Sequence, residues 1–220
     1  MSEFPRVVPF GESAYLVELG AGVDLDVNAR VHALARRLDS GADGLLIGRT
    51  VPAYASLLVP LLGDGPADLA DLAERLAVIA GEVMASGSPA EGRLVRIPVM
   101  YGYDDGPDLE DVATATGISA DSVIDQHAAV TYRVYMLGFS PGFAYLGPLP
   151  EALRVPRRAE PRVRVPAGSV AVAGAQTAVY PHVTPGGWHI IGRADVALWD
   201  PSAPEPARLR PGDRVRFVPA

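Results

Sequence analysis

Apolar side chains recur at helical spacing in two stretches near the N-terminus. Between Leu25 and Leu38 they fall at i, i+4, i+7 and i+11, and residues 66–84 repeat such a stripe, which predicts two amphipathic helices. Turn residues divide the apolar runs at 6–19 and 44–62, so each run predicts a pair of strands. The order strand-strand-helix-strand-strand-helix is typical of a small α+β unit with its helices on one face of an antiparallel sheet.

This pattern breaks at residues 85–92, which read ASGSPAEG. Small and polar residues with Gly and Pro, placed after a complete helical pattern, are typical of a linker between domains. We therefore predict an N-terminal domain over residues 1–88 and a second domain over residues 89–220.

The second domain has few helical signals. Residues 93–101 alternate as a strand does, and two short helices are expected, at 108–116 and from Ser119, which is a good N-cap residue. From residue 131 onward, short apolar runs alternate with Gly and Pro turns, which favours a β-barrel or sandwich. The expected strands are Tyr132–Leu137, Ser169–Ala173, Thr177–Tyr180, Trp188–Gly192, Ala197–Trp199 and Arg214–Val218.

Composition narrows the class of protein. The 220 residues are 49% hydrophobic with a net charge of -7, so we expect a globular core and no binding to nucleic acid or to an anionic membrane, since both need a basic face. The chain contains no cysteine and no lysine, which excludes thiolate nucleophiles, cysteine-ligated zinc and lysine-based catalysis. No apolar run approaches the roughly 20 residues of a membrane helix and no secretory signal is evident, so we expect a cytoplasmic protein.

Gly, Pro, Arg and aromatic residues are concentrated between Tyr135 and Arg193, above all in GFSPGFAYL from Gly138 and PHVTPGGW from Pro181. Two interpretations fit these motifs: rigid loops shaped around a ligand, or tight barrel corners filled by rings. The G-x-S-x-G pattern around Ser140 is that of a nucleophile elbow. That motif needs a helix after the serine, and the prolines that follow here argue against one.

Charged side chains in and near this segment are candidates for chemistry. Of the four histidines, His127 is the best general acid or base near neutral pH, although a structural role fits as well, and none has the spacing of a zinc site. Guanidinium groups bind carboxylate and phosphate, so a cluster of five arginines predicts an anion site or a docking strip for an acidic partner, with a solvated strand edge as the alternative. The cluster consists of Arg154, Arg157, Arg158, Arg162 and Arg164.

The same motifs belong to a longer series of segments that covers most of residues 94–218. The series consists of YGYDDGPDL, the residues His127 to Tyr132, LGFSPGFAYLGPLP, PRRAEPRVRVPAGSV, GAQTAVYP, TPGGWHIIGR and PGDRVRF. In this series the chain resembles the family that comprises KipI, the B subunit of 5-oxoprolinase (PxpB) and allophanate hydrolase subunit 1. The N-terminal part is similar more loosely, through GESAYLVEL.

The resemblance implies an α+β protein, with a small N-terminal α+β (ferredoxin-like) domain followed by a C-terminal cyclophilin-like β-barrel. It implies one component of an ATP-dependent enzyme that hydrolyses 5-oxo-L-proline to L-glutamate and is inactive without its partner. The expected partners are a homologous second subunit, of the type of KipA, the C subunit of 5-oxoprolinase or allophanate hydrolase subunit 2, and a third 5-oxoprolinase subunit. ATP, with Mg²⁺, would be shared with those subunits, and no metal site is expected in this chain.

On this interpretation the catalytic candidates are His127 and Arg158. The residues expected to bind substrate or nucleotide are Phe139, Phe143, Tyr145, Arg157, Arg162, Gln176, Thr177, Tyr180, Gly186, Gly187 and Trp188.

Three alternatives stay open at this point. One is an allophanate- or urea-type amide hydrolase subunit, although the lysine and serines of an amidase-type active site are missing. Another is a KipI-type inhibitor of a histidine kinase. Prolyl isomerase activity is the third, and it rests on analogy of fold alone.

Overall fold

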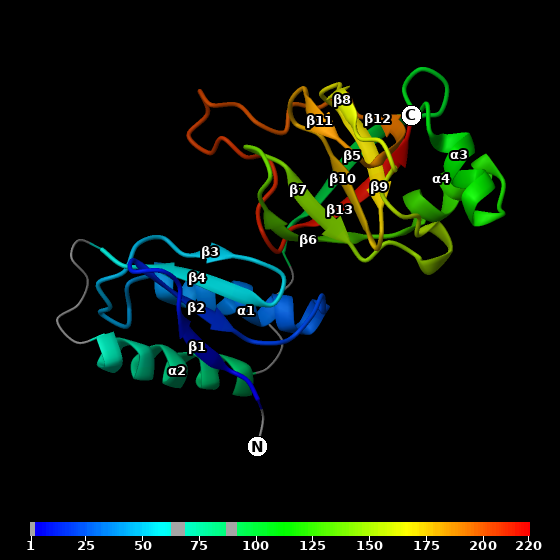
Figure 1. The fold of residues 1–220 in the computed structure, drawn as a ribbon. Coiled ribbons are helices and arrows are strands. Elements are labelled where there is room, and N and C mark those ends of the chain that lie inside the picture. The colour runs from blue at the N-terminus through cyan, green and yellow to red at the C-terminus, as the bar shows by residue number, and fades with distance from the viewer. Residues whose placement is uncertain (1–2, 63–68, 87–91) are drawn as a thin grey trace. The chain divides into compact units, whose positions relative to one another are not determined.

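The computed structural model describes residues 3–62, 69–86 and 92–220 (Figure 1). Contacts within the chain divide it into two compact units, residues 1–90 and 91–220. The predicted boundary between residues 88 and 89 lies outside the described residues.

The N-terminal unit is a four-stranded antiparallel sheet with two helices. The strand order is β1-β2-β4-β3, so β4 lies between the two strands that α1 connects. This is the split βαβ arrangement of ferredoxin-like folds, except that the outer position beside β2 is filled by the first strand of the chain. The elements are β1 (Arg6–Pro9), β2 (Ala14–Glu18), α1 (Leu25–Asp39), β3 (Val51–Pro52), β4 (Ser56–Pro60) and α2 (Leu69–Ala85).

The predicted order of elements in this unit is confirmed, because the apolar stripes pack against one another. Val17, Leu57 and Val59 alternate onto the buried face of the sheet, and the stripes of both helices cover them. Helix α1 contacts β3 and β4, α2 contacts β1 and β2, and the two helices contact each other. The expected start of the second helix, at residue 66, lies outside the described residues.

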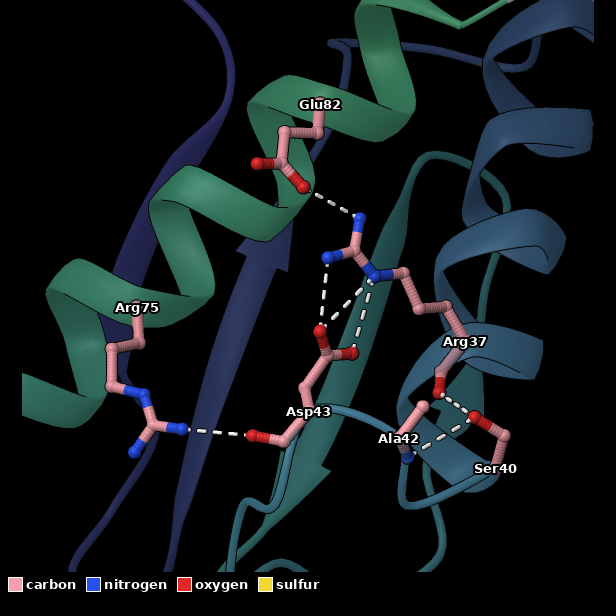
Figure 2. A network of polar contacts seen from close by, with 6 residues as sticks. All are labelled: Arg37, Ser40, Ala42, Asp43, Arg75 and Glu82. Atoms are coloured by element: carbon pink, nitrogen blue, oxygen red, sulfur yellow. Dashed lines mark hydrogen bonds and ion pairs between the residues drawn. The ribbon is translucent and has the colours of Figure 1, made fainter.

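A network of ion pairs joins the two helices to the loop after α1 (Figure 2). Arg37, in the last turn of α1, donates Nε and Nη2 to the carboxylate of Asp43 and Nη1 to Glu82 of α2, the last at 2.8 Å. Arg75 of α2 donates Nη2 to the carbonyl oxygen of Asp43 at 2.8 Å. The hydrogen bonds that Arg37 donates to the two carboxylates hold its pKa above the ordinary value.

The second unit is built on a closed barrel with the strand order β10-β7-β6-β13-β5-β12-β9. All neighbours are antiparallel except β13 and β5, which are parallel. Figure 1 shows the last strand of the chain beside the first strand of the barrel. The barrel strands are β5 (Leu94–Tyr101), β6 (Tyr132–Leu137), β7 (Ala144–Gly147), β9 (Ser169–Ala173), β10 (Gln176–Val179), β12 (His189–Arg193) and β13 (Arg214–Pro219).

Smaller elements complete this unit. Helices α3 (Leu109–Thr116) and α4 (Ala120–Ala129) pack against each other beside the barrel, α3 against β12 and α4 against β13 (Figure 1). A separate ribbon pairs β8 (Arg162–Val165) with β11 (Thr184–Gly186), and a short 3-10 helix spans Glu151–Leu153.

The α+β class and the barrel that the resemblance implied are therefore confirmed, with local differences. Strands β7, β8 and β11 were not predicted. The predicted strand Ala197–Trp199 is wrong, because only one isolated bridge, between Trp199 and Ala207, forms there.

Candidate functional site

The loop between β6 and β7 holds a phenyl ring at the surface by means of a strained backbone. The N–H of Ser140 donates to the carbonyl of Gly138, two residues earlier, at 2.8 Å, and the residue between them, Phe139, has φ 66°. This is a γ-turn with a left-handed central residue, a rare conformation for a bulky side chain. Phe139 is 61% exposed, so burial does not compensate for the strain.

Behind this loop lies a group of aromatic rings in edge-to-face contact. Phe143 is at its centre, with its ring centroid 5.0 Å from that of Tyr145, 5.3 Å from Tyr180 and 5.9 Å from Trp188. Phe139 completes the group, 5.2 Å from Phe143. The rings come from the β6–β7 loop, β7 and the segments that follow β10 and β11. Rings packed in this way form a rigid wall, since each fixes the orientation of the next.

These rings and two arginines enclose a cavity of about 210 Å³. The structure thus brings together nine of the residues predicted from the sequence and adds Pro161, which was missed. Pro161 stands beside Arg162 in a matched motif, which was the available signal. The lining residues are Phe139, Phe143, Tyr145, Arg157, Arg158, Pro161, Tyr180, Gly186, Gly187 and Trp188.

Gly186, the first of two glycines before Trp188, leaves the space that the Tyr180 ring occupies. A Cβ on Gly186 would lie 2.3 Å from the Tyr180 hydroxyl oxygen, so a larger residue cannot occupy this position while the ring stays. The backbone N–H of Trp188 also donates to this hydroxyl. Burial raises the pKa values of both Tyr145 and Tyr180, so both phenols are neutral hydrogen-bond donors near neutral pH.

A buried carboxylate orders the arginine segment beside the cavity. Asp108, which is 2% exposed, accepts from Arg158 Nη1 at 2.8 Å and from Arg162 Nη1 and Nη2 at 2.8 and 2.7 Å. It also accepts the backbone N–H of Ile190 at 2.7 Å. Burial acts to raise the pKa of Asp108, but the hydrogen bonds from Arg162 and Ile190 and the charges of both arginines outweigh it and lower the pKa. Sequence reasoning missed Asp108, although it lies within the matched segment YGYDDGPDL.

Arg157 differs from its neighbours. It is exposed and lines the cavity, and among the described residues no hydrogen bond or ion pair occupies its guanidinium group. It lines the cavity together with Tyr145 and Tyr180, and its charge opposes the rise in the pKa of both phenols.

Four predicted residues are not brought to the cavity. Arg162 points to Asp108, and Gln176 and Thr177 lie on β10. His127 is fully buried, with Nδ1 2.8 Å from the Tyr101 hydroxyl and Nε2 2.9 Å from the Thr177 hydroxyl. Its ring stacks on Phe217 with the centroids 4.6 Å apart. The structure therefore places His127 inside the barrel, because its helix packs on β13.

Ser140 lacks the surroundings of a nucleophile. Its Oγ is buried and has no hydrogen-bond partner in the described part of the chain. A strand, β7, follows the turn in place of the helix that a nucleophile elbow needs.

The cavity is small and the chain has no standard phosphate-binding loop. The cavity volume is below the roughly 300–1,000 Å³ typical of drug-sized ligands. Within residues 3–62, 69–86 and 92–220, no group of three or more His, Cys, Asp or Glu side chains could hold a metal ion. No helix of this described part is long and apolar enough to cross a membrane.

Comparison with known sequences gives consistent matches. A family model described as "Carboxyltransferase domain, subdomain C and D" matches residues 5–209. A protein from Escherichia coli O157:H7, named as the B subunit of 5-oxoprolinase, is 47% identical over 215 residues, covering 97% of this chain and 95% of that protein. A second protein of that name, from Bacillus subtilis strain 168, is 40% identical over 226 residues, covering 97% and 92%.

Solved structures agree in fold. The protein in the crystal structure of TTHA0988 is 41% identical in sequence, with a TM-score of 0.79. The match covers 94% of this chain but only 40% of that longer chain. A conserved uncharacterized protein from Pyrococcus horikoshii, PH0987, is 40% identical with a TM-score of 0.57, covering 98% of this chain and 97% of that one. The Kluyveromyces lactis urea carboxylase, at 19% identity and a TM-score of 0.76, is similar over 97% of this chain and 21% of its own, and shows the fold alone.

Proposed function

Since this chain belongs to the carboxyltransferase subdomain C and D family, we propose that it is the B subunit of a 5-oxoprolinase, which hydrolyses 5-oxo-L-proline to L-glutamate together with partner subunits. The relatives that bear this name, at 40 to 47% identity over nearly the full chain, carry the proposal.

The chemistry of the cavity supports a small cyclic amide as ligand. 5-Oxoproline combines an apolar ring edge, an amide and a carboxylate. The aromatic wall around Phe143 suits the ring edge, the neutral phenols of Tyr145 and Tyr180 can donate to the amide oxygen, and Arg157 suits the carboxylate. A volume of about 210 Å³ admits a ligand of this size without the adenosine and phosphates of a nucleotide.

On this proposal the chain binds and orients the substrate and supplies no nucleophile of its own. It has no cysteine or lysine, and the hydroxyl of Ser140 has no hydrogen-bond partner in the described part of the chain that could act as a base. A lactam carbonyl is a poor electrophile, so its hydrolysis needs activation, for which we propose ATP. Because the cavity is small, we propose that the nucleotide, and Mg²⁺ with it, binds to the partner subunits. The partners we propose are a homologous second subunit and a third one, and this chain alone is expected to be inactive.

The test is release of glutamate from 5-oxoproline by the co-purified subunits, with ATP, in preparations that contain or lack this chain. We expect glutamate only when the chain is present. Equal release without it would contradict the proposal. Allophanate and urea are included as alternative substrates. Turnover of either in place of 5-oxoproline would assign the complex to urea-type amides.

A further inference from the structure

Three arginines lie at or beside the cavity, and Asp108 determines which of them is available to a ligand. A carboxylate has about four lone-pair positions, and all four hydrogen bonds to Asp108 come from within the protein. Three of them come from Arg158 and Arg162. The single buried negative charge is therefore shared between two cations.

Arg162 and Arg158 are held in fixed positions by this arrangement. Arg162 makes a bidentate pair, in which each of its two terminal nitrogens donates to one oxygen of Asp108. Arg158 donates Nη1 to Asp108 and its backbone N–H to the carbonyl of Gly187 at 2.8 Å. Its Nε is buried and faces no acceptor in the described part of the chain, so a ligand cannot reach that atom unless the site rearranges.

Arg157 lines the cavity and has no hydrogen-bond or ion-pair partner among the described residues. It adjoins Arg158, whose backbone and side chain are both fixed, and it lines the same cavity wall. With no partner among the described residues, its planar guanidinium can face a carboxylate with two parallel hydrogen bonds. The nearby phenols of Tyr145 and Tyr180 are donors, so they offer that guanidinium no negative charge.

We propose that Arg157 binds the carboxylate of the substrate and so selects an anionic lactam over a neutral one, while Asp108 keeps Arg158 and Arg162 as positioning residues. This inference rests on the proposed function of the cavity. The sequence predicted an anion site for the arginine cluster as a whole, and this inference assigns the anion to Arg157 alone.

The experiment compares 5-oxoproline with its neutral amide, 5-oxoprolinamide, on the assembled complex. Binding is measured by titration calorimetry and turnover by ATP-dependent lactam opening. The variants are Arg157→Gln, Arg157→Lys and, as a matched control, Arg164→Gln, which removes an exposed charge from the neighbouring strand β8, outside the cavity lining. For Arg157→Gln we expect affinity for 5-oxoproline to fall about tenfold or more, the size of a lost charge-assisted hydrogen bond, with affinity for the amide nearly unchanged.

Arg157→Lys should recover part of the preference, because it restores the charge without the fork, and Arg164→Gln should match the wild type. If Arg157→Gln lowers the affinity for both ligands equally, or lowers neither, the inference is overturned. The proposed function would still stand in that case, provided that the wild-type complex turns over 5-oxoproline. Loss of carboxylate preference in a complex that binds 5-oxoproline but releases no glutamate would support the inference and contradict the function. Absence of binding to the wild-type complex would overturn both.

Discussion

The imidazole of His127 has both ring nitrogens hydrogen-bonded inside the barrel, and this determines its charge state. The Thr177 hydroxyl donates to the carbonyl of Ala171 at 3.0 Å, so its oxygen accepts the proton on Nε2 of His127. Nδ1 is then left to accept from the Tyr101 hydroxyl. Burial lowers the pKa of His127 to about 3, so the ring is a neutral group near neutral pH, and it is not among the residues that line the cavity.

This arrangement predicts a pH-dependent stability of the barrel. Between pH 6.5 and about 3, the unfolded chain binds a proton at His127 that the folded chain does not, so stability falls as the pH falls through this window. The slope from this group is at most about 1.4 kcal/mol per pH unit. His127→Gln should be less stable at pH 7 but should lose this slope. Urea unfolding followed by tryptophan fluorescence measures it, because both tryptophans, Trp188 and Trp199, lie in the barrel unit. Identical slopes for both proteins would contradict the prediction.

The left-handed backbone at Phe139 gives a second prediction at this scale. Phe139→Gly removes a strain of about 1–2 kcal/mol, while the ring it deletes is mostly exposed. The variant should therefore unfold at a higher urea concentration than Phe139→Ala, which lacks the ring but keeps the strain. Both variants should bind 5-oxoproline more weakly, since the ring lines the cavity. If the alanine variant proves the more stable of the two, the backbone is not strained.

Single residues also show where prediction from sequence stops. The cluster of arginines was visible as a possible anion site, but the partners of its members could not be predicted. Their partner, Asp108, lies 50 positions from Arg158 and 54 from Arg162, so no local pattern reveals the pairing. The burial of His127 was hidden from local patterns in the same way, because its partner Thr177 lies 50 positions away.

Elements with their own periodicity were predictable, and elements defined by pairing were not. Helices α1 and α2 carry continuous apolar stripes, and β5 alternates over its length. Strands β7, β8 and β11 are three or four residues long and lie among Gly and Pro residues. Their extended state comes from partners elsewhere in the chain, which their own sequence does not specify.

The ion pairs between α1, α2 and the following loop should stabilise the N-terminal unit. Arg37→Gln removes a bidentate pair to Asp43 and a second pair to Glu82, and we expect a loss of about 1–2 kcal/mol, since a network with bidentate geometry exceeds a lone surface pair. Hydrogen exchange in α1 and α2 measures the effect. The matched control is Arg36→Gln, which removes an exposed charge one residue earlier and should change exchange little. Equal exchange in both variants would show that the network contributes nothing measurable.

At the scale of the whole molecule, the cavity collects side chains from segments between residues 139 and 188. Most of these residues could be predicted from the sequence motifs, because aromatic residues next to Gly and Pro are typical of rigid loops. Closure of the barrel was beyond reach without the resemblance to a family. It depends on the pairing of β5 with β13, whose registers run from Leu94 with Arg214 to Val99 with Pro219.

That pairing has a consequence for synthesis of the protein. Strand β13 lies between β5 and β6, so both of these strands keep an open edge until β13 has left the ribosome. All other neighbouring pairs of barrel strands can form earlier, but the ring of hydrogen bonds closes only when β13 pairs with β5 and β6. Contacts of such long sequence separation form slowly, and open strand edges are sites of aggregation. During synthesis the barrel is therefore prone to aggregation until β13 inserts between β5 and β6 and covers both open edges.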